Sequence, residues 1–169
     1  MAIPFPVSII RELLGLDDVD DARVLRWSDA AIPGSSPMTW DEIEAAREDQ
    51  RATLLAATIA GRGTDGDDLT TALANAEIDG DRLTDDEIVM FQNQLLIAGN
   101  ETTRNMISGG VAALSTRPEA WARLRTDPAL IPSVVEEFLR WTTPVISFMR
   151  TATRATELGG VPIAADEPV

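Results

Sequence analysis

Residues 84–118, TDDEIVMFQNQLLIAGNETTRNMISGGVAALSTRP, are the most informative part of the chain because they predict one unusually long helix. Thr84 with Glu87 three residues later forms a capping box, and Pro118 ends the pattern. From residue 85 to about 116 the helix is roughly 48 Å long at about 1.5 Å per residue, enough to cross a whole domain. Between these limits apolar residues recur near helical spacing, at Ile88, Phe91, Leu95, Ile97, Ala98, Met106, Val111 and Leu114.

The middle of this helix contains residues that weaken a helix. Residues 98–103, AGNETT, include a glycine, which costs about 1 kcal/mol relative to alanine, and two adjacent β-branched threonines. Such a conflict between local propensity and overall pattern is typical of functional sites. The small residues indicate that a flat or bulky group lies against the helix. The acid beside a hydroxyl indicates a pair that handles protons at that contact. Counting by threes and fours from Thr102 places on or beside one stripe Met90, Gln94, Ile97, Ala98 and Glu101.

The composition restricts the class of protein. A chain of 169 residues that is 44% hydrophobic suits one domain, so we expect residues 1–169 to form a single domain. We find no apolar run of membrane-spanning length and no signal-peptide pattern, and we therefore expect a cytoplasmic protein without a membrane partner. The net charge of −14, with nine acids against two arginines in residues 61–87, excludes nucleic acid as a direct partner.

The sequence contains no cysteine and no histidine. The usual nitrogen and sulfur ligands of zinc and iron are therefore missing, and no disulfide can form. Any transition-metal chemistry would need a ligand from outside these residues.

The pattern outside the long helix predicts a mainly α protein with a short β region at its C-terminal end. Pro33 to Pro37 read as a loop, and from Thr143 β-branched and aromatic residues predict extended segments joined by a turn at Gly159-Gly160. The chain ends within a strand pattern, which indicates a truncated chain, with a terminal hairpin lying against helices as the alternative. The other helices are expected over residues 4–14, 18–32, 41–60 and 67–76, over a short segment after 118, and over 132–141.

Two pairs of residues in this sequence are candidates for chemistry. Glu101 and Thr102 can relay protons if the acid exchanges with solvent and the hydroxyl orients a bound group. The alternative is structural, with Thr102 bonded to the carbonyl one turn back and Glu101 paired with Arg104. Glu137 and Arg140 share a face of a helix that its apolar neighbours predict to be largely buried, where loss of one partner would cost about 3–5 kcal/mol.

Arg150 follows an apolar extended run, 144–149. An arginine in that position suits a carboxylate or phosphate on a ligand whose body lies against the apolar part. A surface arginine paired with an acid is the alternative.

With these residues identified, the chain resembles the cytochrome P-450 family of haem-thiolate monooxygenases, in its soluble bacterial form. Residues 98–103 resemble the small-Gly-x-acid-Thr-Thr motif of the family's long central helix, and residues 137–140, EFLR, resemble its Glu-x-x-Arg motif. Residues 144–150 and 157–161 resemble the segment that lines the substrate pocket and reaches a haem propionate. The resemblance covers essentially the whole chain and implies the central part of that fold.

The resemblance implies a role for each candidate residue. Ala98 and Gly99 would let haem b and dioxygen approach the helix, Glu101 and Thr102 would deliver protons, and Arg150 would pair with a propionate. Glu137 and Arg140 would brace the core. The substrate would be faced by Met90, Gln94, Ile97, Val145 and Ile146.

The family holds its iron by a cysteine thiolate downstream of the Glu-x-x-Arg helix, and this chain contains no such residue. The thiolate promotes O–O cleavage. We therefore expect this polypeptide alone to hold no haem stably and to be inactive.

For the complete enzyme the resemblance implies NAD(P)H-dependent insertion of one oxygen atom of O₂ into an apolar small molecule. Electrons would arrive from a ferredoxin or flavodoxin. Residues 100–105 and 141–145 look most like actinobacterial members that act on sterol side chains or branched lipids.

Two other functions compete with this interpretation. The first is a cofactor-free helical interaction module, in which Gly99, Gly109 and Gly110 admit a partner helix. The second, a hydrolase with Glu101 as its base, lacks a visible set of nucleophile, base and oxyanion donors.

Overall fold

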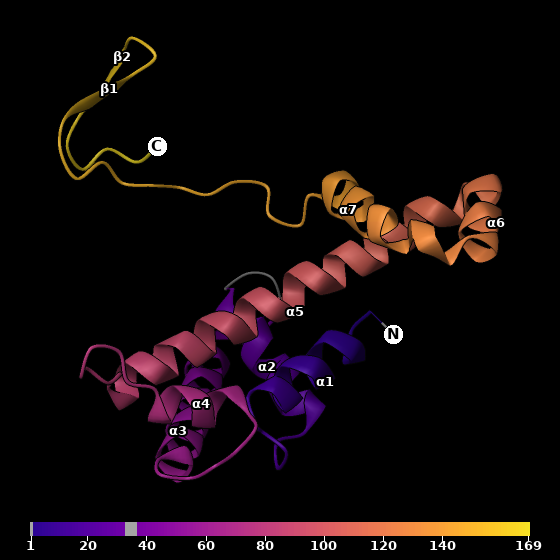
Figure 1. The fold of residues 1–169 in the computed structure, drawn as a ribbon. Helices are drawn as coiled ribbons and strands as arrows, with labels where there is room; N and C mark the ends of the chain where they lie inside the picture. Colours follow the sequence, from indigo (N-terminus) through magenta and orange to yellow (C-terminus); the bar gives the residue numbers. More distant parts are fainter. Residues whose placement is uncertain (1, 33–36) are drawn as a thin grey trace.

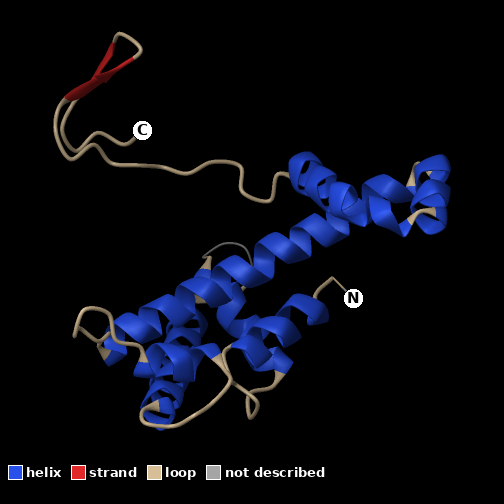
Figure 2. Cartoon of the chain, in the orientation of Figure 1, coloured by secondary structure: helices blue, strands red, loops and turns tan. Residues whose placement is uncertain are grey.

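The computed structural model describes residues 2–32 and 37–169, which are mainly helical (Figures 1 and 2). This confirms the fold class predicted from the sequence, while Pro33 to Ser36 of the expected loop lie outside the described residues. In chain order the elements are α1 Pro4–Leu13, α2 Asp21–Ala31, α3 Trp40–Gly61, α4 Leu69–Asn75, α5 Asp85–Ser115, α6 Pro118–Thr126, the 3₁₀ turn η1 Pro128–Leu130, α7 Ile131–Thr142, β1 Thr156–Leu158 and β2 Val161–Ile163.

Helix α5 has 31 residues and is the axis of the structure. The predicted capping box at its start is present: the Glu87 amide donates to Thr84 Oγ1 at 3.3 Å, and the Thr84 amide donates to the Glu87 carboxylate at 2.8 Å. Each bond satisfies an amide that the first helical turn leaves without a partner. The predicted limits of this helix are confirmed to within one residue.

The N-terminal half of α5 packs on α1, α2, α3 and α4, which lie together on one side of it (Figure 1). The apolar faces of these helices form the core between them. Its largest members are almost completely buried, among them Val7, Leu14, Val24, Trp27, Leu54 and Leu96.

A polar cluster fastens α2 to α3 beside this core. The Asp49 carboxylate accepts two hydrogen bonds from Arg23, at 2.6 and 2.8 Å, and one from the indole nitrogen of Trp27 at 2.8 Å. Arg23 also donates to the hydroxyl of Thr53 at 2.7 Å. The Arg23 bonds lower the pKa of Asp49 below its ordinary value and outweigh the effect of its partial burial.

The C-terminal end of α5 extends beyond the core, and α6 and α7 pack against it (Figure 1). No residue of α6, η1 or α7 is buried. The prediction of a largely buried helix around Glu137 is therefore wrong for this chain, because α7 packs on α5 along one side and no other described segment covers its opposite face.

The C-terminal hairpin forms as predicted, with Thr156 paired to Ile163 in antiparallel register. Gly159 and Gly160 form its turn at φ values of +59° and +83°, which glycine adopts without steric cost. The hairpin lies apart from the helices (red in Figure 2), so it does not cover them. None of the helices in the described ranges is both long and apolar enough to span a bilayer.

Candidate functional site

The weakened middle of α5 presents a shallow face made of small side chains. Ala98 is exposed and Thr102 is half-buried one turn later on the same side. The Thr102 hydroxyl donates to the carbonyl oxygen of Ala98 at 2.5 Å. This is the hydrogen bond to the preceding turn that we expected if Thr102 had a purely structural role. This bond fixes the direction of the hydroxyl proton and leaves a lone pair of Oγ1 free to accept from a bound group.

Glu101 forms the ion pair with Arg104 that we expected if Glu101 had a purely structural role. Its carboxylate accepts from Arg104 at 2.8 Å, and the two side chains are 20% and 24% exposed. Both partners therefore still reach solvent. The predicted proton relay by Glu101 and Thr102 is neither formed nor prevented by these contacts, and it stays a prediction.

Gly99 and Asn100 point away from this face. A Cβ at Gly99 would lie 3.3 Å from Ile10 of α1. Asn100 is fully buried and donates to the Ser28 hydroxyl at 2.9 Å. Gly99 thus lets α1 approach α5, and its predicted contact with a cofactor remains untested.

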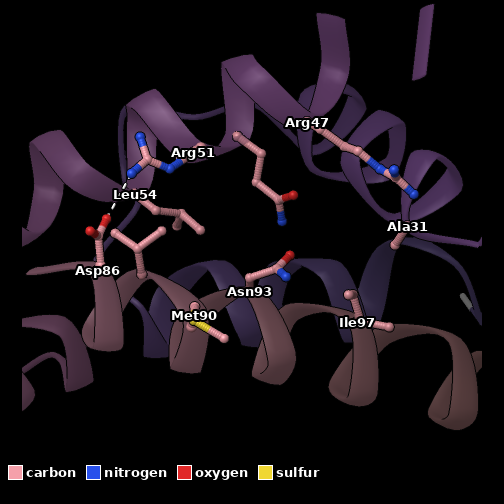
Figure 3. A pocket seen from close by; sticks show the side chains of 10 residues that line it. Ala31, Arg47, Arg51, Leu54, Asp86, Met90, Asn93 and Ile97 are labelled. Carbon is pink, nitrogen blue, oxygen red and sulfur yellow. Dashed lines mark hydrogen bonds and ion pairs between the residues drawn. The ribbon is translucent and has the colours of Figure 1, made fainter. Parts of the chain in front are cut away.

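A cavity of about 560 Å³ lies between α3 and α5 (Figure 3). Met90 and Ile97 line it as part of one α5 stripe, as expected for residues seven apart, whereas Gln94 is exposed outside it. The other two predicted pocket residues, Val145 and Ile146, are 43% and 90% exposed on the segment after α7. The structure therefore brings together only part of the predicted substrate pocket.

Arg150 lies on that same exposed segment. Its guanidinium stacks over the ring of Phe148 at 5.5 Å and donates to the carbonyl of Met149 at 3.1 Å. These contacts are local, and they do not bring Arg150 to the face formed by Ala98 and Thr102. Its predicted pairing with a propionate stays a prediction.

Glu137 and Arg140 form the predicted ion pair through two hydrogen bonds of 2.6 Å. The pair lowers the pKa of Glu137 and raises the pKa of Arg140. However, the two side chains are 56% and 66% exposed, so the large cost expected for a buried pair does not apply.

Five polar residues of the cavity were not predicted from the sequence, namely Arg47, Gln50, Arg51, Asp86 and Asn93. Gln50 carried a detectable signal, because it interrupts a buried stripe of α3 at spacings of three and four. The other members of that stripe are Ile43, Ala46, Leu54, Thr58 and Gly61.

Comparison with known proteins identifies the family. The family profile described as Cytochrome P-450 matches residues 39–169. The chain therefore belongs to the cytochrome P-450 family, whose members carry haem.

Two curated relatives illustrate the similarity. The chain is 38% identical over 177 residues to a steroid C26-monooxygenase of Mycobacterium tuberculosis, covering 99% of the chain and 46% of that protein. It is 39% identical over 173 residues to a methyl-branched lipid omega-hydroxylase of Mycobacterium bovis, covering 100% and 40% respectively. The chain thus spans less than half the length of these relatives.

Solved structures agree with the fold. The crystal structure of CYP108D1 from Novosphingobium aromaticivorans matches with a TM-score of 0.86 and 31% identity, over 99% of this chain and 40% of that one. CYP109E1 from Bacillus megaterium in complex with testosterone matches with a TM-score of 0.86 and 33% identity, over 99% and 46%.

The described residues fit haem only in part. The small side chains at Ala98 and Thr102 leave a face on which a flat group can lie. The sequence offers no thiolate or imidazole to an iron, and residues 2–32 and 37–169 contain no group of three side chains suited to a metal ion. These residues can therefore form one wall of a haem site but not hold the iron.

Proposed function

We propose that the complete protein is a haem-dependent monooxygenase that inserts one atom of O₂ into an apolar substrate, and that residues 1–169 are a central part of its catalytic domain. The single observation that carries this proposal is the face of small side chains that α5 presents at Ala98 and Thr102, in a chain of the cytochrome P-450 family. When bound, haem supplies the chemistry of oxygen activation.

The residues of this chain then have definite tasks. The small side chain of Ala98 leaves room for a flat group to lie against α5. Thr102 holds its proton on the Ala98 carbonyl and offers a lone pair of Oγ1 to a donor on a bound group. Glu101 reaches solvent, so it can take up a proton there and pass it toward the hydroxyl. Arg150, if its segment turns toward this face, would pair with a propionate.

The substrate class follows from the relatives and from the cavity. The relatives named above act on a steroid and on methyl-branched lipids, and Met90 and Ile97 contribute apolar surface to the cavity of this chain. We therefore assign an apolar sterol or branched lipid as substrate. Electrons from NAD(P)H would arrive through a ferredoxin or flavodoxin in the cytoplasm.

The direct test uses protein expressed with all the coding sequence that flanks these residues in the gene. Its absorption spectrum is recorded after reduction and treatment with carbon monoxide. The thiolate-type shift is expected from that protein and not from residues 1–169 alone. Complete protein without the shift would overturn the proposal.

A pair of variants tests the α5 face. Ala98→Leu adds bulk where a flat group would lie, and it should weaken haem binding measured by titration. Ala112→Leu makes the same change at an exposed position further along α5 and should bind haem as the unaltered protein does. If both variants bound haem equally well, the α5 face at Ala98 would not be part of the haem site.

A further inference from the structure

The geometry points to the cavity between α3 and α5 as a binding site for the carboxylate end of an otherwise apolar molecule. This inference narrows the substrate class of the activity proposed above, and it rests on that proposal. It stands on three features of the cavity: two carboxamides that make no hydrogen bond within residues 2–32 and 37–169, an arginine that forms no ion pair within the same residues, and apolar walls.

The first carboxamide belongs to Gln50 on α3, which is only 6% exposed. Its Nε2 atom is buried without a hydrogen-bond partner, and no hydrogen bond joins this side chain to any other residue in the described ranges. A buried donor without an acceptor is unfavourable, so we expect a bound molecule to supply the acceptor. Because a half-turn of the terminal bond exchanges nitrogen and oxygen, the group can present an N–H to the cavity.

A second buried glutamine shows how such a side chain is satisfied when its role is structural. Gln92 on α5 is fully buried, donates to Thr70 Oγ1 at 2.9 Å and accepts from Thr58 Oγ1 at 3.4 Å. Gln50 lies in a comparable stripe of the neighbouring helix and has neither bond. The difference lies in the surroundings, because Gln50 lines the cavity and Gln92 does not.

The second carboxamide belongs to Asn93 on the opposite wall. Figure 3 shows Asn93 extending from α5 toward α3, at a point on the helix between Met90 and Ile97. Within the part of the chain that the structure describes, its side chain makes no hydrogen bond either. Two carboxamides on facing walls can together donate to both oxygens of one carboxylate.

The charge of the cavity favours an anion. At one end Arg51 is neutralised by Asp86 at 2.7 Å, a pair drawn as a dashed line in Figure 3. At the other end Arg47 donates to the carbonyl of Ala30 at 3.2 Å and forms no ion pair with residues 2–32 or 37–169. The cavity is therefore positive by one charge in a protein whose net charge is −14. An anionic end group would supply the missing partner of Arg47.

The remaining lining is apolar and includes Leu54, Val89, Met90 and Ile97. A volume of about 560 Å³ is ordinary for a small-molecule site. The apolar body of the ligand would contact these side chains while its carboxylate meets the polar ones.

Equilibrium dialysis of the complete protein with decanoate and, separately, 1-decanol tests the inference without use of the haem spectrum. Decanoate should bind more tightly than 1-decanol. Arg47→Gln should weaken decanoate binding about tenfold, as loss of one charge-assisted hydrogen bond implies, and leave 1-decanol binding unchanged. Gln50→Leu and Asn93→Leu should each weaken decanoate binding. Arg82→Gln, which makes the same change of charge at an exposed pair with Glu77, should have no effect.

Three results would overturn the inference. The first is equal binding of decanoate and 1-decanol, and the second is an equal effect of Arg47→Gln and Arg82→Gln. The third is a complete protein that gives the thiolate-type spectrum but does not bind decanoate, which would refute this inference and leave the proposed function intact. If the complete protein bound decanoate selectively but gave no such spectrum, the proposed oxygenase activity would be refuted. The carboxylate site would then still be supported.

Discussion

Gly110 of α5 lies directly against the aromatic ring of Phe138 of α7, so closely that a Cβ at position 110 would overlap the ring. One turn away on α7, Thr142 has its methyl group where a Cβ of Gly109 would lie, at 2.7 Å. The glycines that a helical interaction module would offer to a partner are thus used inside this chain, and Gly99 likewise admits Ile10 of α1. Packing within the chain therefore explains these three glycines, which were the basis for proposing a helical interaction module.

Gly110→Ala should destabilise the packing of α7 on α5. Helix propensity alone favours alanine by about 1 kcal/mol, but overlap with the Phe138 ring should cost about 1–3 kcal/mol. A urea titration followed by tryptophan fluorescence measures this change, because Trp121 of α6 and Trp141 of α7 contribute to the signal. Ser108→Ala, at an exposed position on the same helix, is the control. A higher urea midpoint for Gly110→Ala would mean that the two helices do not pack as described.

Gln50→Leu and Gln92→Leu should have opposite effects on stability. In Gln92→Leu the buried hydroxyls of Thr58 and Thr70 lose a partner, at a cost of about 1–3 kcal/mol in the free energy of unfolding. In Gln50→Leu a buried donor without a partner is removed, so stability should be unchanged or higher. Thermal unfolding of ligand-free protein measures both. A clear loss in Gln50→Leu would assign Gln50 a structural role.

Asp49→Asn should change how stability depends on pH. Because the folded state lowers the pKa of Asp49, its contribution is complete above the ordinary carboxyl pKa and is lost as the pH falls through the lowered value. Asp49→Asn should therefore lower the free energy of unfolding by about 1–2 kcal/mol at neutral pH and progressively less in acid. Urea midpoints from neutral to acid pH test this, and a constant difference across the range would contradict it.

Thr102→Val should uncouple oxidation from product formation in the complete enzyme. Valine keeps the shape of the side chain but cannot hold a proton on the Ala98 carbonyl. Product formed per NAD(P)H oxidised should fall at least about tenfold, with stability nearly unchanged. Thr103→Val makes the same change at the adjacent position, off this face, and should keep the yield. Equal yields in the two variants would exclude the Thr102 hydroxyl from proton handling.

Glu137→Gln should hardly affect the stability of residues 1–169. The ion pair with Arg140 is well formed but exposed, so solvent and salt screen it. The urea midpoint should match that of the unaltered chain in high salt and fall slightly below it in low salt. A large, salt-independent loss would show that the pair is shielded from solvent after all.

Local sequence signals were sufficient to predict the helical elements and the positions of the motifs. A capping box, a terminating proline and apolar spacing located α5 to within a residue, and paired glycines located the hairpin turn, because these signals act between residues close in the chain. The short-range bonds of Thr102 and of Glu101 were foreseen as an alternative for the same reason.

The side chains that meet across helices could not be predicted from spacing, because these contacts depend on how the helices pack. Spacing could place Gly99 and Ala98 next to one another, but not assign the first to α1 and the second to an open face. Nor could it show that α3 crosses α5 so that Gln50 and Asn93 line one cavity, while Val145 and Ile146 stay outside it. Helical periodicity fixes the direction of a side chain around its own axis, whereas the partner it faces depends on how separate helices pack.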